Sequence, residues 1–133
     1  MKKDLYVGQS ASVKRRVTAE DVEKFAELTG DFNGVHLDDE IAKKSIFGRR
    51  VCHGMLISSF ISTVLGTCLP GEGTIYLSQE LQFKKPVYLD EEIEISVEVE
   101  TITQEKGIVS LKTIVTKSDG DVAVSGNAKV MFN

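Results

Sequence analysis

The chain has 133 residues, of which 41% are apolar and 27% charged, and its formal net charge is -4 at pH 7. This composition predicts one globular domain, residues 1–133, and excludes a disordered or fibrous chain. The acidic balance excludes a general nucleic-acid binder, which needs a basic surface. Cys52 and Cys68 lack the number and spacing of a disulfide framework, and the N-terminal residues lack the apolar run of a secretory signal. A cytoplasmic protein is therefore expected.

The first third of the chain predicts a short strand followed by two helices. Residues 8–17 alternate weakly, as in a strand. Thr18 is a typical helix cap, with acidic residues after it, and Gly30 is a typical stop signal, so a helix is expected between them. A second short helix is expected from Asp38 to about Ser45, because acidic side chains favour the positive end of a helix dipole.

An uncharged segment in the middle of the chain predicts a buried helix. Residues 51–71 contain no Asp, Glu, Lys or Arg, but they carry several serines and threonines. These polar residues make the segment a poor membrane span. From His53 to about Gly66 there is no clear polar face, which predicts a helix of roughly 20 Å surrounded by protein on all sides.

The second half of the chain has the period of two that is typical of strands. The segment 92–100 alternates most clearly, and the Asp-Gly pair at 119–120 suits a tight hairpin between two later strands. Short turns imply antiparallel pairing. Helices followed by strands make an α+β chain, in which an antiparallel sheet wraps around the long central apolar helix. The expected strands cover residues 75–83, 92–100, 107–117 and 121–132.

The candidate chemistry lies at Asp31 and His36, in a stretch expected to be irregular. Near neutral pH an Asp is a carboxylate and a His can be neutral, so together they can hold a water and move its protons. The alternative is that Asp31 caps the loop and His36 is structural, and this spacing alone favours that alternative. Gly54, at the start of the apolar helix, adds a backbone N–H that can stabilise a developing oxyanion, or it is simply chosen for close packing.

Other residues of the apolar helix and its start carry weaker signals. Ser62 lies about two turns beyond Gly54 and can face the same cavity, although a serine bonded to its own helix is commoner. Asp31, His36, Cys52 and His53 have atoms that can ligate a metal, but the spacing of known zinc sites is absent, so no metal and no cofactor are expected.

Several separated motifs together resemble those of one enzyme family. They are residues 31–33, residues 36–38, Phe47, Arg49, residues 53–56, residues 69–71, residues 75–77 and residues 83–84, before Pro86. The family that they resemble is the MaoC-like (R)-specific enoyl-CoA hydratases, in their short single-domain form. The resemblance spans nearly the whole chain and departs at Gly34-Val35, where relatives commonly have proline and a small or apolar residue, and at Cys52.

This resemblance implies a hot-dog fold, with residues 51–69 as the central helix, and a homodimer. It implies reversible hydration of trans-2-enoyl-CoA to (R)-3-hydroxyacyl-CoA, a reaction that feeds polyhydroxyalkanoate synthesis in members of the family. Asp31 and His36 would hold the attacking water, with Asp31 the base and His36 sharing proton delivery, and Gly54 would polarise the thioester carbonyl. The implied substrate-binding residues are Ser62, Leu65, Val130, His53 and Lys84.

Three rival functions stay open from the sequence. A hot-dog thioesterase would direct the water to the thioester carbon. A 3-hydroxyacyl-carrier-protein dehydratase would run the same chemistry on a protein-borne chain. A hot-dog module without activity would bind acyl-CoA as a sensor, but the presence of both Asp31 and His36 disfavours it.

Overall fold

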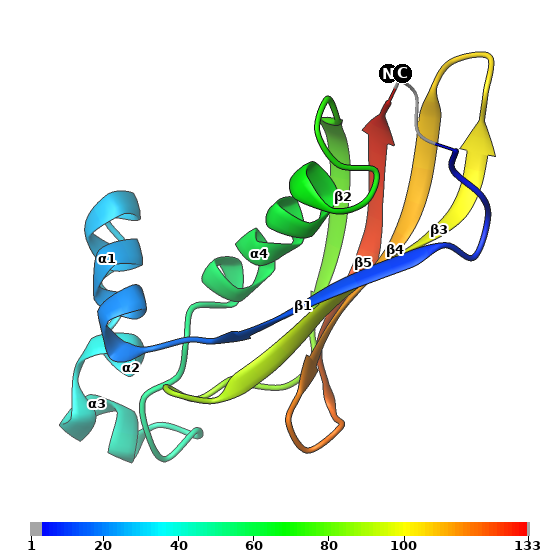
Figure 1. Cartoon of the computed structure of the whole chain (residues 1–133). Coiled ribbons are helices and arrows are strands. Elements are labelled where there is room, and N and C mark those ends of the chain that lie inside the picture. Colours follow the sequence, from blue (N-terminus) through cyan, green and yellow to red (C-terminus); the bar gives the residue numbers. More distant parts are fainter. Residues whose placement is uncertain (1–3, 133) are drawn as a thin grey trace.

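The computed structural model describes residues 4–132, which form one antiparallel sheet, a helix packed across it and three short helices at one end (Figure 1). The sheet has the strand order β1-β3-β4-β5-β2, and every neighbouring pair is antiparallel. The strands are β1 (Ser10–Arg16), β2 (Ile75–Phe83), β3 (Glu92–Thr103), β4 (Ile108–Lys117) and β5 (Val122–Met131). The helices are α1 (Ala19–Thr29), α2 (Gly34–Leu37), α3 (Asp39–Lys44) and α4 (Gly54–Thr67).

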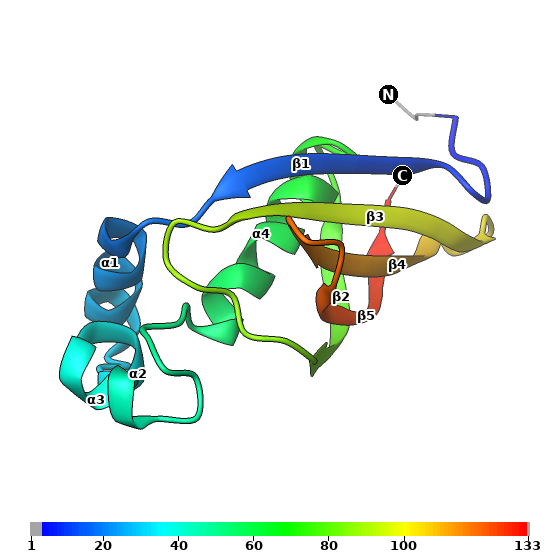
Figure 2. The ribbon, with the colours of Figure 1, turned by 90° about the horizontal axis from the view of Figure 1, so that it is seen from below.

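The sheet curls around α4, which confirms the predicted hot-dog architecture (Figures 1 and 2). Strand β3 follows the predicted alternation, with buried apolar residues between exposed glutamates. Its buried side chains, such as Ile95 and Val97, join those of α4, such as Ile61 and Leu65, in one core. Each is at most 1% exposed. Burial of such aliphatic side chains contributes about 1.5–3 kcal/mol each, so this shared core holds the helix to the sheet.

The local signals in the first third of the chain are confirmed. Thr18 caps α1 in a capping box with Asp21, whose pKa is lowered first by the hydrogen bond that its carboxylate accepts from the Thr18 backbone N–H. Gly30 ends α1 in the left-handed conformation, with φ 83°. Asp38 caps α3, as its carboxylate accepts hydrogen bonds from two N–H groups of the first turn.

The expectation that residues 30–36 form an irregular loop is wrong in its second half. His36 lies on the single-turn helix α2, which begins because the Asn33 side chain accepts a hydrogen bond from the Val35 N–H. Gly34 permits close packing against α3, because a Cβ at this position would lie 2.6 Å from Ile41 Cδ1. The glycine at this departure therefore leaves room for the Ile41 side chain.

The central helix is shorter and more exposed than expected. It spans Gly54–Thr67, within the predicted residues 51–69. One side of α4 is open to solvent, including Met55, Ser62 and Thr63, so the expectation of burial on all sides is wrong for these residues. Ser62 and Thr63 are exposed on this side, whereas Ser58 is buried and donates a hydrogen bond to the Gly54 carbonyl of its own helix over 2.8 Å. No helix within residues 4–132 combines the length and the apolar character needed to cross a membrane.

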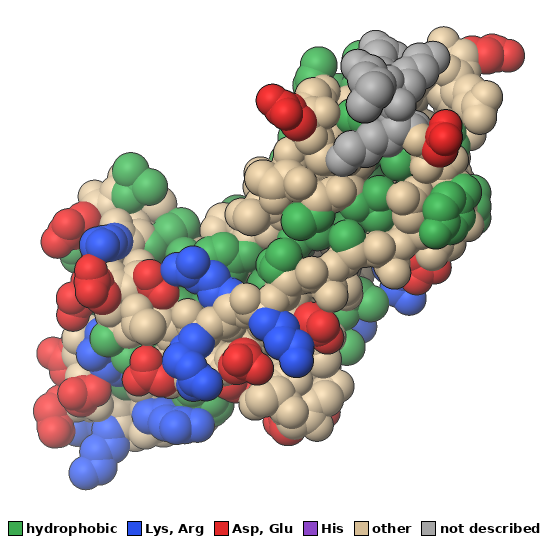
Figure 3. All heavy atoms as spheres, in the orientation of Figure 1, with side chains coloured by type: hydrophobic (Ala, Val, Ile, Leu, Met, Phe, Trp, Pro, Cys, Tyr) green, Lys and Arg blue, Asp and Glu red, His purple; other side chains and the backbone are tan. Residues whose placement is uncertain are grey.

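Charged side chains gather at the end of the molecule that α1, α2 and α3 form, whereas apolar side chains run along the middle of the same face (Figure 3). Strand β2 is an outer strand of the sheet, and a bulge between Tyr76 and Ser78 interrupts its pairing with β5. Several of its large apolar residues are exposed, among them Ile75 and Leu77. The β2 edge of the sheet thus carries exposed apolar side chains.

Candidate active site

The N-terminal end of α4 faces the group of short helices, and this is where the predicted chemical residues meet (Figure 1). Asp31 lies directly after α1, His36 on α2 and His53 at the cap position of α4. One ligand-type atom from each of these side chains lies within 4.8 Å of the others. The structure therefore brings together two segments whose residues are at least 17 positions apart in the sequence.

A hydrogen bond fixes the tautomer of His36. Its Nδ1 lies 2.7 Å from the carbonyl oxygen of Val51. A carbonyl oxygen can only accept, so Nδ1 carries the hydrogen and Nε2 of the neutral ring keeps its lone pair. Arg50 holds the same turn from its other end, because its Nε–H donates to the His36 carbonyl over 2.8 Å. The ring of His36 thus offers Nε2 as a base.

Asp31 is exposed and held by its own turn. Its Oδ1 accepts a hydrogen bond from the Asn33 N–H over 3.3 Å, and its N–H donates to the Thr29 hydroxyl. The carboxylate therefore has a fixed position and still has lone pairs for a further partner. Together, Asp31 and the Nε2 of His36 present only acceptors, which is the set that holds a water by both of its hydrogens.

A cavity of about 430 Å³ opens beside these groups, within the range of about 300–1,000 Å³ typical of small-molecule sites. Asp31, His36, His53, Gly54 and Lys84 all contribute to its lining. Apolar side chains form most of the remaining wall: Phe47, Val51, Cys52, Met55, Ile57, Phe83, Pro86, Val87 and Val124. The site can hold an apolar chain next to an acid–base pair.

Gly54 is the first residue of α4, so its N–H has no acceptor inside the helix and lies at the positive end of the helix dipole. A Cβ at this position would lie 2.7 Å from the ring of Phe83, which also lines the cavity. Only glycine leaves the approach to this amide open. The predicted oxyanion donor is thus placed at the wall of the cavity that contains Asp31 and His36.

Three of the predicted substrate-binding residues lie outside the cavity lining. Leu65 and Val130 are buried in the core, at 1% and 0% exposure, and Ser62 is exposed on α4. None of these three is part of the cavity lining, and their roles stay predictions. Cys52 is buried beside the site, where burial raises the pKa of its thiol to about 12, so it is a poor nucleophile.

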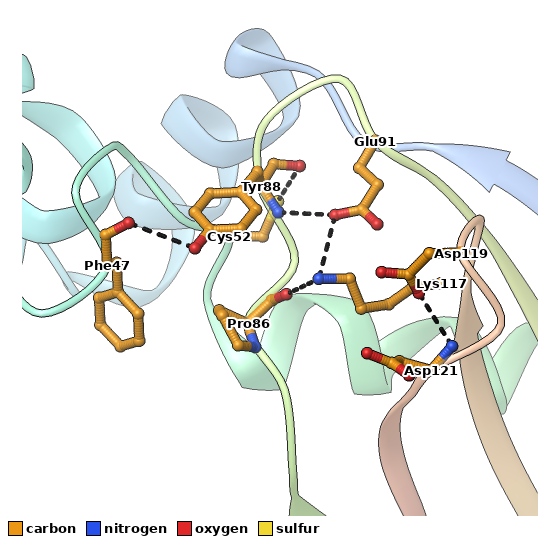
Figure 4. A network of polar contacts seen from close by, with 8 residues as sticks. All are labelled: Phe47, Cys52, Pro86, Tyr88, Glu91, Lys117, Asp119 and Asp121. Atoms are coloured by element: carbon orange, nitrogen blue, oxygen red, sulfur yellow. Dashed lines mark hydrogen bonds and ion pairs between the residues drawn. The ribbon is translucent and has the colours of Figure 1, made fainter.

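A polar network links segments that contribute to the cavity lining (Figure 4). The ammonium group of Lys117 donates to the Pro86 carbonyl over 2.6 Å and forms an ion pair with Glu91 at 3.6 Å. Tyr88 connects the segment that contains Pro86 and Glu91 to the segment before α4, since the Tyr88 hydroxyl donates to the Phe47 carbonyl over 3.2 Å. Because Phe47 and Pro86 both line the cavity, the network ties two of its walls together.

Sequence reasoning missed the tertiary partners of the site. The Val51 carbonyl that sets the His36 tautomer and the Phe83 ring that faces Gly54 come from distant segments. Phe83 was within the motifs that carry the resemblance, but no spacing rule assigns it a role. Contacts of this kind depend on how the sheet curls and leave no local signal.

Comparison with known proteins agrees with this geometry. Residues 7–120 match the family model described as "MaoC like domain". An (R)-specific enoyl-CoA hydratase of Aeromonas caviae is 44% identical over 95% of this chain and 94% of its own length. Another of the same name, from Rhodospirillum rubrum, is 41% identical over 96% of this chain and 88% of its own.

A solved structure described as an (R)-hydratase from A. caviae involved in PHA biosynthesis superimposes with a TM-score of 0.96. It is 42% identical, and the match covers 98% of this chain and 99% of that one. Both the sequence and the fold are thus shared over nearly the full length. The chain belongs to the MaoC-like family.

Proposed function

We propose that the protein is an (R)-specific enoyl-CoA hydratase, a hydro-lyase that reversibly adds water to trans-2-enoyl-CoA to give (R)-3-hydroxyacyl-CoA. The observation that supports this most is the convergence of Asp31, His36 and the Gly54 amide on one largely apolar cavity. The names of the similar proteins support the substrate class and the stereochemistry.

The proposed reaction follows from the three groups. A water held by the Asp31 carboxylate and by Nε2 of His36 attacks C3 of the enoyl thioester, and one of its protons passes to this pair, with Asp31 the base. The π electrons move to the thioester oxygen, where the Gly54 N–H stabilises the negative charge. The Asp31 and His36 pair then returns that proton to C2 as the enolate collapses, so that one water has been added in total.

The His36 tautomer refines the order of proton transfer. Because Nδ1 donates to Val51, Nε2 of the neutral ring has no proton to give at the outset. His36 can therefore share in proton delivery to C2 only after it has accepted a proton itself. No metal or organic cofactor is required for these steps.

The test of this function is incubation of purified protein with crotonyl-CoA. We expect the conjugated double bond to be consumed without release of free thiol, and (R)-3-hydroxybutyryl-CoA to accumulate. Thiol release with survival of the double bond would instead identify the thioesterase. Competition between crotonyl-CoA and the same acyl group on carrier protein separates the hydratase from the carrier-protein dehydratase.

Lys84 and Lys85 support a CoA thioester as the substrate. Both side chains are exposed and line the cavity, and their N–H groups are anchored to the Ala123 carbonyl over 2.8 and 3.2 Å. Neither lysine forms an ion pair with another residue in the described range, 4–132. Two unpaired cations at a cavity mouth are suited to the phosphates of coenzyme A.

We predict that Lys84→Ala/Lys85→Ala raises KM for crotonyl-CoA roughly 3- to 10-fold at low salt, with little change in kcat. The reason is that both lysines would contact phosphates far from the reacting carbons. KM for crotonyl-N-acetylcysteamine, which lacks phosphates, should not change. The control Lys112→Ala/Lys129→Ala removes the same charge from exposed sites on β4 and β5. An equal rise in KM in the control, or with the short thioester, would refute the assignment.

A homodimer is the assembly that we propose, with β2 at the interface. This strand has an unpaired edge, and Ile75, Leu77 and Phe83 on it are 46–56% exposed. Exposed apolar edges of this kind are rare in monomers, and pairing with a second copy would cover both the edge and the side chains. Sedimentation should give twice the chain mass, and Leu77→Glu should shift it toward the monomer. Wild-type protein that sediments as a monomer would refute the dimer.

The cytoplasm is the compartment that we propose. Both Cys52 and Cys68 are free thiols in the structure, and free exposed thiols such as Cys68 are suited to a reducing environment.

A further inference from the structure

His53 is a buried polar residue that the proposed reaction does not use. It is 2% exposed and occupies the cap position of α4, immediately before Gly54. Its side chain forms no capping hydrogen bond with the helix. A histidine that is buried at this position without capping the helix needs another reason for its presence.

The first contact of His53 is with the segment that carries Asp31. Its Nε2 lies 3.1 Å from the Asp31 carbonyl oxygen. Because that oxygen can only accept, Nε2 carries the hydrogen and donates it. The bond joins the start of α4 to the backbone of Asp31, so it constrains the position from which the Asp31 side chain extends.

The second contact of His53 is with the ring of His36. The two ring centroids are 3.9 Å apart, with 30° between the planes, and Phe25 packs against His53 at 4.9 Å. The imidazole of His36 is therefore held between the Val51 carbonyl at its edge and the His53 ring at its face. The buried ring of His53 thus contacts both members of the acid–base pair: the backbone carbonyl of Asp31 and the ring of His36.

The surroundings of His53 keep it neutral. Its Nδ1 is buried without a hydrogen-bond partner among residues 4–132, so a proton there would have no acceptor. Burial lowers the pKa of His53, although the bond to the Asp31 carbonyl opposes this effect. A neutral ring matters, because a cation stacked on His36 would disfavour the uptake of a proton by that residue.

We propose that His53 is a positioning residue, which fixes Asp31 through its Nε2–H bond and His36 through its ring so that both point at one water. This inference rests on the proposed function, since it assigns His53 to the same proton-transfer pair. It is separate from the expectation that His53 binds substrate, which stays a prediction, since His53 also lines the cavity.

The matched pair His53→Gln and His53→Met tests this proposal. The two side chains have nearly the same length, but only the amide of Gln can donate to the Asp31 carbonyl from the position of Nε2. A displacement of about 1 Å at a reacting group can cost 100-fold in rate, so we expect His53→Met to lower kcat about 10- to 100-fold with KM almost unchanged. His53→Gln should retain at least about ten times the kcat of His53→Met.

The decisive comparison repeats this pair in an Asp31→Asn background. If the donor acts through the Asp31 carboxylate, the difference between Gln and Met should vanish there. Equal kcat for Gln and Met in the wild-type background, or the same deficit of Met with and without the Asp31 carboxylate, would overturn the proposal. Should circular dichroism show that His53→Met is unfolded, His53→Phe, which keeps a ring but lacks the donor, takes its place. Absence of hydration by the wild type would refute the proposed function, a result separate from all of these.

Discussion

Asp31→Asn is expected to lower kcat for crotonyl-CoA hydration by about 10²- to 10⁴-fold, the range typical of a general acid or base. The change is nearly isosteric, and the amide oxygen can still accept the hydrogen bond from the Asn33 N–H. Because Asp31 is exposed, we expect no appreciable change in the free energy of unfolding. The variant therefore removes proton transfer without removing the site, and initial rates on crotonyl-CoA measure the loss.

His36→Asn provides the second half of this prediction. Asparagine can place an N–H near the position of Nδ1 and keep the bond to the Val51 carbonyl, but it has nothing at the position of Nε2. We expect a folded protein with a loss of kcat of similar order to that in Asp31→Asn. Retention of most of the activity in either variant, with the fold intact by circular dichroism, would contradict the assigned acid–base pair.

Gly54→Ala is expected to lower kcat about 100-fold, because the new methyl group blocks the amide that would bind the thioester oxygen. The Cβ would lie 2.7 Å from the Phe83 ring. Since Phe83 lines the open cavity, its ring can turn aside there, so we expect the helix to form while the cavity wall moves. Kinetics on crotonyl-CoA, read together with the melting temperature, distinguish a blocked site from an unfolded one.

Gly66→Ala is the matched control on the same helix. A Cβ at Gly66 would meet no atom within 4 Å, so the substitution adds only helix propensity. We expect it to stabilise the protein by about 0.5–1 kcal/mol and to leave kcat unchanged. If Gly54→Ala also left kcat unchanged, the role of the Gly54 amide would be refuted.

The parts of the fold that the sequence predicted are those with local causes. The capping box at Thr18, the left-handed Gly30 and the alternation of β3 are each determined by neighbouring residues and by the period of the element. The exposed side of α4 was not predicted, because an apolar pattern shows that a helix can be buried but not how far one sheet reaches around it.

The sequence predicted the chemical groups of the candidate site, but not the contacts that hold those groups in place. Asp31, His36 and Gly54 could be named because short motifs carry them. The contacts of His53 with both Asp31 and His36 depend on how α4 meets α2, and no spacing in the sequence encodes that. The short helix α2 was also missed, because a four-residue helix is too short to show a periodic pattern.

Hydration in water labelled with heavy oxygen tests the central claim most directly, since it reports where the water held by Asp31 and His36 is delivered. After turnover of crotonyl-CoA by the wild-type protein, mass spectrometry locates the label in the product. We predict that the label is in the 3-hydroxyl group of an intact CoA thioester. Label in a free carboxylate, together with released coenzyme A, would show that the water attacks the thioester carbon and would contradict the account.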